Sequence, residues 1–424
     1  MPPDAVTISP APKAAPNSSG LKITALETVI PADIMPGLLL LRIHTDAGFI
    51  GHGETYYAPH AVAAMIHDWM GRRLLGSDPL SIESHWRFLY ERASAFGSRG
   101  AELRAISAID LALWDILGQV CGRPVWQLLG GKARARVRLY NSSGGPTYGR
   151  RADTACDQGW PGHGDIGKPG PLEDNWASNH AAGDLAEELV AEGYAAMKFW
   201  TFDCAYHEHG GAFLPWSVVK QCVRPMEEVR ERVGDKIEIL LDGHGFFQLP
   251  AALRIAEVMR DLRPLWLEDV MRVDNADTLA DFRAKAGVPI AVSEMLTSRE
   301  DYRLVLERRA ADYIMIDPTW VGGISETRRL AEYAHAYNLP ATMHDCTGPL
   351  TLFAGLHVAT AVPNVVFQES VRAHIRTFYS QLIETNIEIE NGWALPPAAP
   401  GLGTRLCPAL FDPQRDGYRI TRFG

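Results

Sequence analysis

The sequence shows no excess of basic charge. Among its 424 residues, 51 are Asp or Glu and 41 are Lys or Arg, which gives a formal net charge of −10 at pH 7. Proteins that bind nucleic acids usually carry a basic face, so the composition argues against a nucleic-acid partner. An anionic small-molecule substrate stays compatible with this charge, because a bound cation reverses the local field.

Closely spaced cysteines and long apolar runs are also missing. The six cysteines are scattered and include no C-x-x-C pair, which argues against a zinc site and a disulfide framework. Reduced thiols favour a cytoplasmic protein. No segment approaches the ~18 apolar residues of a membrane span, so no membrane partner is expected. Residues 1–20 are rich in Pro, Ala and Ser, lack the apolar core of a signal peptide, and are interpreted as a flexible tail.

Hydrophobic residues make up 46% of the chain, which permits a large core, and the length suggests more than one domain. A first α+β unit is predicted over residues 21–135. Residues 38–44 and 49–54 have the pattern of two strands in a hairpin. A helical apolar stripe follows, and Gly118 and Gly122 are expected to end it.

Eight apolar runs then alternate with helical stretches, which is typical of a parallel sheet. Their total length fits an α/β protein of the (β/α)8 barrel type, with about 250 residues. We predict this barrel over residues 136–388 and expect residues 389–424 to return to the N-terminal unit. The Gly/Pro-rich residues 145–183 interrupt the rhythm and have the length of a lid or binding loop. The expected strands lie near residues 137–141, 195–200, 237–242, 265–268, 290–294, 313–317, 341–344 and 365–369.

Three acidic residues end consecutive predicted strands at an even spacing of 26 residues: Asp242, Glu268 and Glu294. The carboxyl ends of barrel strands lie on one rim, so the three carboxylates are expected to meet. Carboxylates without thiolates favour a hard ion, and Mg²⁺ is therefore the predicted cofactor.

The strand-end series also contains Lys198, Asp317, His344 and Glu369. A single acidic residue after an apolar run is equally well explained as a helix N-cap. An N-cap preference does not select Lys or His, so the series as a whole favours a site. Asp317 and His344 end neighbouring strands, and a carboxylate beside an imidazole is the arrangement of a general base. Metal and base together predict proton abstraction next to a substrate carboxylate.

Several motifs resemble those of one known family. They are AISAIDLALWD at residues 105–115, LLGG at 128–131, GYAAMK at 193–198, and DPTWVGG at 317–323. This combination is similar to the enolase superfamily, in its mandelate racemase-like group. The resemblance implies an N-terminal capping domain on a modified TIM barrel, and a homo-oligomer. It also implies that Asp242, Glu268 and Glu294 bind Mg²⁺ and that His344 with Asp317 is the base. Glu369 would contact the intermediate, and Lys198 would neutralise the substrate carboxylate.

Two positions narrow the implied reaction. Trp200 stands where mandelate racemase has a second base, which argues against racemisation. His244 follows Asp242 by two residues, and continued strand alternation would place both side chains on one side. The Asp-x-His pattern is similar to galactonate and mannonate dehydratases, in which the His protonates the departing hydroxyl; the alternative is a simple loop histidine.

The predicted function is Mg²⁺-dependent dehydration of an aldonate or aldarate to a 2-keto-3-deoxy acid through an ene-diolate. An epimerase, racemase or cycloisomerase using the same intermediate is the nearest alternative, and a non-catalytic sugar-acid sensor is a third. Trp200, Tyr56 and Tyr57 are candidate substrate contacts. Simple packing explains Trp200 equally well, and a surface or interface position explains the two tyrosines equally well. His207 and His209 are interpreted as part of a solvated loop or lid rather than a second metal site.

Overall fold

The structure, a computed structural model, describes residues 6–8, 19–97, 99–150 and 166–424. Most of the predicted N-terminal tail and the middle of the predicted long loop lie outside these residues. Within the tail, Val6–Ile8 forms strand β1. No helix in the described part of the chain combines the length and apolarity needed to cross a membrane.

The predicted barrel is confirmed. Eight parallel strands pair in chain order, and the last strand closes on the first through the pairs Gln368–Leu139, Glu369–Tyr140 and Ser370–Asn141. The strands are β5 (Val137–Ser142), β6 (Ala196–Phe199), β7 (Glu238–Asp242), β8 (Trp266–Glu268), β9 (Ile290–Val292), β10 (Tyr313–Ile316), β11 (Ala341–Met343) and β12 (Val365–Ser370).

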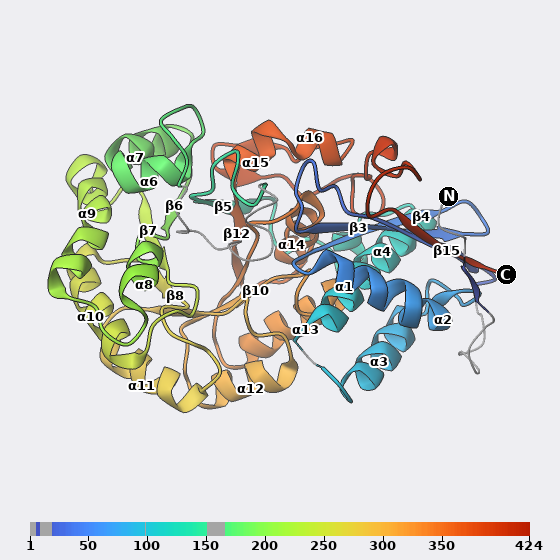
Figure 1. Ribbon diagram of the computed structural model, residues 1–424, viewed down its shortest axis with the longest axis horizontal. Coiled ribbons are helices and arrows are strands. Elements are labelled where there is room, and N and C mark those ends of the chain that lie inside the picture. The colour runs from blue at the N-terminus through green and yellow to red at the C-terminus, as the bar shows by residue number, and fades with distance from the viewer. Residues whose placement is uncertain (1–5, 9–18, 98, 151–165) are drawn as a thin grey trace.

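Helices surround the strands and bury their outer faces (Figure 1). On β7, Ile239 and Leu241 join the large core shared with the helices, while Leu240 joins a cluster with Trp266 and Met315. Both sets are buried because alternate residues of a barrel strand face outward and inward. The helices after β5 are α6 (Asp174–His180), α7 (Ala182–Ala191), α8 (Asp203–His209), α9 (Trp216–Val233), α10 (Leu249–Met259), α11 (Ala276–Ala286), α12 (Arg299–Glu307), α13 (Gly323–Ala336), α14 (Pro349–Ala361), α15 (Arg372–Thr377) and α16 (Tyr379–Leu382).

The predicted N-terminal α+β unit is also present, as a sheet in the order β1-β15-β2-β3-β4 with helices packed against it. Strand β15 comes from the C-terminus and pairs antiparallel with β2, as Figure 1 shows by the red strand among the blue ones. The short strands β13 (Ile389–Glu390) and β14 (Trp393–Ala394) instead extend the barrel sheet beside β5. The elements of the unit are β2 (Ile23–Val29), β3 (Leu38–Thr45), β4 (Ile50–Tyr56), α1 (Pro59–Ala64), the π-helical turn Met65–Met70, α2 (Gly71–Leu74), α3 (Ile82–Ala93), α4 (Ala101–Cys121), α5 (Val125–Leu128) and β15 (Arg419–Phe423).

Two of the motifs read from the sequence meet where this unit contacts the barrel. The carboxylate of Asp110 on α4 accepts hydrogen bonds from the backbone N–H of Ser325 (3.0 Å) and from its hydroxyl (2.6 Å). The hydroxyl of Ser107 accepts a bond from the N–H of Gly322 at 2.8 Å. Helix α4 therefore satisfies backbone donors at the start of α13, which a helix cannot satisfy itself.

Two local expectations differ from the structure, one of them only in part. Helix α4 ends at Cys121, directly before Gly122 in the left-handed conformation, as expected, but it continues through Gly118. A Cβ on Gly118 would lie 2.5 Å from the Cα of Gly401, so this glycine permits a close chain crossing instead of ending the helix. The predicted loop 145–183 also contains α6 and the start of α7.

Candidate active site

The three predicted metal ligands converge at the carboxyl ends of β7, β8 and the segment after β9. Ligand oxygens of Asp242, Glu268 and Glu294 lie within 4.8 Å of one another, and all three residues are buried. Asp242 and Glu268 are direct neighbours in the register of β7 and β8. Among the described residues, Oε2 of Glu294 has no hydrogen-bond partner. Buried carboxylates at this spacing repel one another, so the donor set fits a hard divalent cation such as Mg²⁺.

Lys198 lies beside this cluster with its side chain completely enclosed. Its Nζ is 2.7 Å from Oε1 of Glu268, 2.7 Å from Oε1 of Glu369 and 3.3 Å from Oδ2 of Asp242. Burial by itself lowers the pKa of this lysine, but the surrounding carboxylates raise the pKa well above its ordinary value. Lys198 is therefore a fixed positive charge within the acidic cluster.

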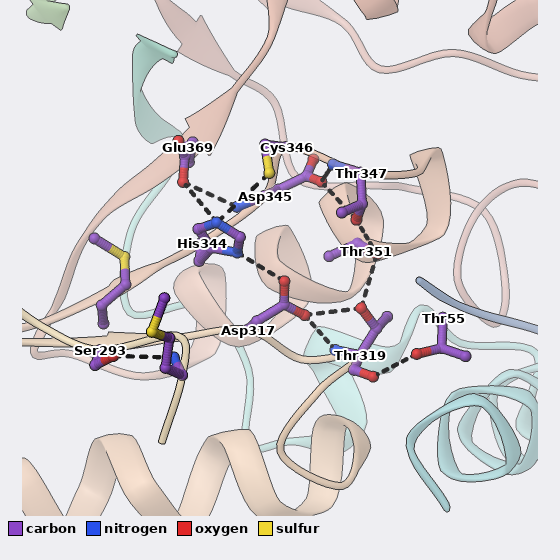
Figure 2. A network of polar contacts seen from close by, with 12 residues as sticks. Thr55, Ser293, Asp317, Thr319, His344, Asp345, Cys346, Thr347, Thr351 and Glu369 are labelled. Atoms are coloured by element: carbon purple, nitrogen blue, oxygen red, sulfur yellow. Dashed lines mark hydrogen bonds and ion pairs between the residues drawn. The ribbon is translucent and has the colours of Figure 1, made fainter. Parts of the chain in front are cut away.

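His344 and Asp317 form the predicted carboxylate–imidazole pair. Nδ1 of His344 lies 2.8 Å from Oδ2 of Asp317, and its Nε2 lies 3.8 Å from Oε2 of Glu369 (Figure 2). Burial lowers the pKa of His344, whereas the nearby Cys346, Glu369 and Asp317 raise it. The resulting pKa lies well above the usual value for histidine. A raised pKa means a more basic imidazole, which accepts a proton whenever the ring is in its neutral form.

The sulfur of Cys346 is 3.7 Å from Nε2 of the same histidine. Burial raises the pKa of this thiol above its usual value, although the neighbouring His344 acts in the opposite direction.

His244 reaches the site by a different route from the one predicted. Strand β7 ends at Asp242, and His244 has a positive φ of 47°, so strand alternation does not place it. Its backbone N–H instead donates to Oδ1 of Asp242 at 2.9 Å, and this turn brings Nε2 to 3.5 Å from Oδ2 of Asp242. Burial lowers the pKa of His244, but Asp203 and Asp242 raise it to about 9, which leaves the ring protonated at neutral pH.

A continuous chain of contacts joins the two histidines. It runs from His344 to Glu369, from Glu369 to Lys198, from Lys198 to Asp242, and from Asp242 to His244. A group held at Asp242 and Glu369 therefore lies between the two imidazoles.

Aromatic side chains line this region. The ring of Trp200 lies 5.9 Å from that of His244 and 5.0 Å from that of Tyr148. The ring of Trp320 lies 5.2 Å from that of His344 and 5.5 Å from that of Tyr57. Of the predicted substrate contacts, Trp200 and Tyr57 thus come near the histidines, whereas the hydroxyl of Tyr56 is bonded to the carbonyl of Gly149 at 3.4 Å.

One expectation about nearby residues was corrected, and two neighbouring carboxylates were not among the predicted site residues. His207 and His209 are exposed in helix α8, not in a loop. Asp269 directly follows the last residue of β8, and its positive φ of 38° turns the chain out of the extended conformation. Its carboxylate accepts a hydrogen bond from the hydroxyl of Ser293. Asp203 was missed, because it follows β6 by several residues and carries no periodic signal.

The chain matches two family descriptions that together span most of its length. Residues 22–130 match "Mandelate racemase / muconate lactonizing enzyme, N-terminal domain", and residues 181–410 match "Enolase C-terminal domain-like". The chain belongs to the enolase superfamily. Within the superfamily it resembles the mandelate racemase-like group and the proteins named sugar-acid dehydratases.

Several relatives of this superfamily member carry the names of sugar-acid dehydratases. A D-xylonate dehydratase of Haloferax volcanii is 32% identical over 91% of this chain and 87% of the relative. A D-galactonate dehydratase of Cronobacter sakazakii is 30% identical over 91% of this chain and 92% of the relative. A solved enolase of the mandelate racemase subgroup from Agrobacterium tumefaciens has a TM-score of 0.81 and 34% identity, covering 95% of this chain and 99% of that one.

Proposed function

We propose that this enolase-superfamily member is a hydro-lyase that dehydrates an aldonate or aldarate to a 2-keto-3-deoxy acid. The observation that carries the proposal is the placement of His344 and His244 at opposite ends of one contact chain through Glu369, Lys198 and Asp242. Dehydration needs a base for the C2 hydrogen and an acid for the C3 hydroxyl, and a single histidine serves only one of these roles at a time.

The first step uses His344, oriented by Asp317. Asp317 accepts from Nδ1, which leaves Nε2 to remove the proton from C2. The electron pair of the C2–H bond moves into the substrate carboxylate and forms an ene-diolate. Lys198 supplies positive charge near that carboxylate, and Glu369 lies between Lys198 and His344 to contact the intermediate.

The second step uses His244. The ene-diolate electrons return to form the C2–C3 double bond, the C3–O bond breaks, and His244 gives a proton to the leaving oxygen. One water molecule is released, because hydroxide itself is a poor leaving group. The enol tautomerises to the 2-keto acid, and both histidines recover their initial protonation states through solvent.

Asp242, Glu268 and Glu294 are the residues that would hold Mg²⁺. When bound there, the ion supplies Lewis-acid stabilisation of the negative charge that develops on the substrate carboxylate. Two observations support a divalent cation here: the three carboxylates are buried close together, and Oε2 of Glu294 has no hydrogen-bond partner among the described residues.

Trp200 supports dehydration over racemisation. Its indole occupies the position two residues after Lys198, is 5% exposed, and packs between Tyr148 and His244. An indole has no basic nitrogen, so Trp200 contributes a wall of the substrate site and leaves the face opposite His344 without a second base from this position. Tyr57, beside Trp320, is proposed as a further wall.

The experiment is a library of stereoisomeric aldonates and aldarates, incubated with the purified protein and Mg²⁺, with EDTA as the control. We expect formation of a 2-keto acid, measured as the semicarbazone, from at least one sugar acid. His344→Asn should abolish product formation, and His244→Asn should slow it by the ~10²–10⁴-fold contribution of a general acid. Exchange of C2 hydrogen in D₂O without water loss would identify an epimerase instead, and neither reaction across the library would refute the proposed enzyme.

A further inference from the structure

Asp203 is a buried carboxylate on the rim of the barrel near His244. It is the first residue of α8, which begins just after β6, and its exposed fraction is 0%. Its backbone N–H donates to the carbonyl of Trp200 at 3.1 Å, so the turn between β6 and α8 fixes its position. A completely buried carboxylate is costly unless another group compensates its charge.

The compensating group is His244. Nδ1 of His244 lies 3.0 Å from Oδ2 of Asp203, with both side chains buried. In the described part of the chain, neither oxygen of Asp203 has a hydrogen-bond donor other than this imidazole. The imidazole thus compensates the buried charge of Asp203, and Asp203 in turn fixes the orientation of one edge of the imidazole ring.

Helix α8 also supports the imidazole from the side. Tyr206, one helical turn after Asp203, stacks on Phe246 with the ring centres 4.3 Å apart. Phe246 and Trp200 each lie 5.9 Å from the His244 ring, measured between ring centres. His244 is therefore held at its edge by Asp203, and the tilted rings of Trp200 and Phe246 lie next to it.

We propose that Asp203 is a positioning residue for His244, the counterpart of Asp317 for His344. With Nδ1–H directed at Asp203, Nε2 is directed toward Asp242, which is where the proposed function requires the proton of the leaving hydroxyl to be delivered. The site would then contain two carboxylate–imidazole pairs, one for the base and one for the acid. This inference rests on the proposed function for its kinetic part only.

The kinetic test compares Asp203→Ala and Asp203→Asn with the wild-type protein on the best sugar acid. Loss of orientation should slow dehydration by at least about tenfold and by no more than the ~10²–10⁴-fold contribution of the acid itself. Hydrogen exchange at C2, which depends on His344, should stay near the wild-type rate, so recovered substrate becomes deuterated. The asparagine variant keeps an acceptor oxygen and should retain more dehydration than the alanine variant.

A double-mutant cycle separates positioning from general damage. If Asp203 acts through His244, Asp203→Ala should have no further effect on dehydration in a His244→Asn background. Cys204→Ala is the matched control, because Cys204 is the next residue of α8 and is exposed. This control should keep both dehydration and exchange unchanged.

A spectroscopic test does not depend on turnover. A proton held between an imidazole nitrogen and a buried carboxylate gives a downfield ¹H NMR resonance that exchanges slowly with solvent. We expect two such resonances in the wild type and in Cys204→Ala, one from each carboxylate–imidazole pair, and the loss of one of them in Asp203→Ala and in His244→Asn. Survival of both resonances in Asp203→Ala would overturn the inference, as would equal losses of dehydration and exchange. If no sugar acid reacts, the proposed function fails, and the NMR result alone decides whether Asp203 holds His244.

Discussion

Asp317 is fixed from the side opposite His344 by Thr319. While Oδ2 of Asp317 faces Nδ1 of the imidazole, its Oδ1 accepts bonds from the backbone N–H of Thr319 (2.7 Å) and from its hydroxyl (2.8 Å). Figure 2 shows this arrangement, with Thr319 in turn bonded to Thr55 of strand β4. Both carboxylate oxygens of Asp317 thus have hydrogen-bond partners, which fixes the orientation of the carboxylate and of the proposed base His344.

Asp317→Asn should therefore lower C2 hydrogen exchange and dehydration together, by about 10²-fold or more. The amide can present an N–H to Nδ1 of His344, which favours the tautomer that carries its proton on Nε2 and so blocks the base. Exchange is measured by NMR in D₂O and dehydration by the 2-keto acid formed. Thr319→Ser keeps the N–H and the hydroxyl and should stay near wild type. Dehydration that falls while exchange persists would assign Asp317 to the second step instead.

Glu294 provides the clearest test of the metal site, because one of its buried oxygens has no hydrogen-bond partner in the described part of the chain. Glu294→Gln removes one of three charges and should weaken Mg²⁺ binding by more than about tenfold. The measurement is isothermal titration of the EDTA-treated protein with Mg²⁺. Glu307→Gln, which alters a half-exposed surface pair with Arg303, should bind Mg²⁺ like wild type. Equal affinities in the two variants would contradict the assignment of this ligand.

Glu54 predicts a pH-dependent contribution to stability. It is completely buried on β4, where Oε1 accepts bonds from the N–H (2.6 Å) and hydroxyl (2.7 Å) of Thr351. Burial raises its pKa from 4.5 to about 7 despite these bonds. An acid with a raised pKa in the folded state stabilises fully below its unfolded pKa and loses that contribution as the pH rises through the folded value.

The free energy of unfolding of the wild type, relative to Glu54→Gln, should therefore fall between about pH 4.5 and 8, by up to about 3 kcal/mol. Glutamine keeps an oxygen that accepts both bonds from Thr351 but does not titrate. Urea unfolding of the two proteins across this range gives the difference directly. Parallel pH profiles would show that Glu54 has the same pKa in the folded and unfolded states.

The strand ends were predictable because a barrel imposes a regular interval between them. The eight strands and the approach of Asp242, Glu268 and Glu294 followed from apolar runs that each end in a reactive residue. Backbone turns with positive φ were not predictable in this way. His244 is near Asp242 because the chain leaves the strand there, and not because the strand continues.

Contacts between segments far apart in the sequence could not be predicted either. Asp203 pairs with a residue 41 positions later (244 − 203), and nothing in the pattern around it indicates this contact. The motif containing Ser107 and Asp110 was visible, but its physical reason, the bonds to Gly322 and Ser325, required the structure.

Gly118 tests how closely α4 approaches the segment before the C-terminal strand. At an exposed position inside a helix, replacing Gly by Ala stabilises the folded protein by about 1 kcal/mol, because alanine has the higher helix propensity. Here the added Cβ would lie 2.5 Å from the Cα and 2.6 Å from the N of Gly401, which are backbone atoms that cannot rotate away. Gly118→Ala should instead lower the free energy of unfolding by about 1–3 kcal/mol. Val120→Ala, at a 36% exposed position of the same helix, is the control and should be nearly neutral. Thermal unfolding of the three proteins decides the point: a higher midpoint for Gly118→Ala than for wild type would mean that α4 and Gly401 do not cross at this distance in solution.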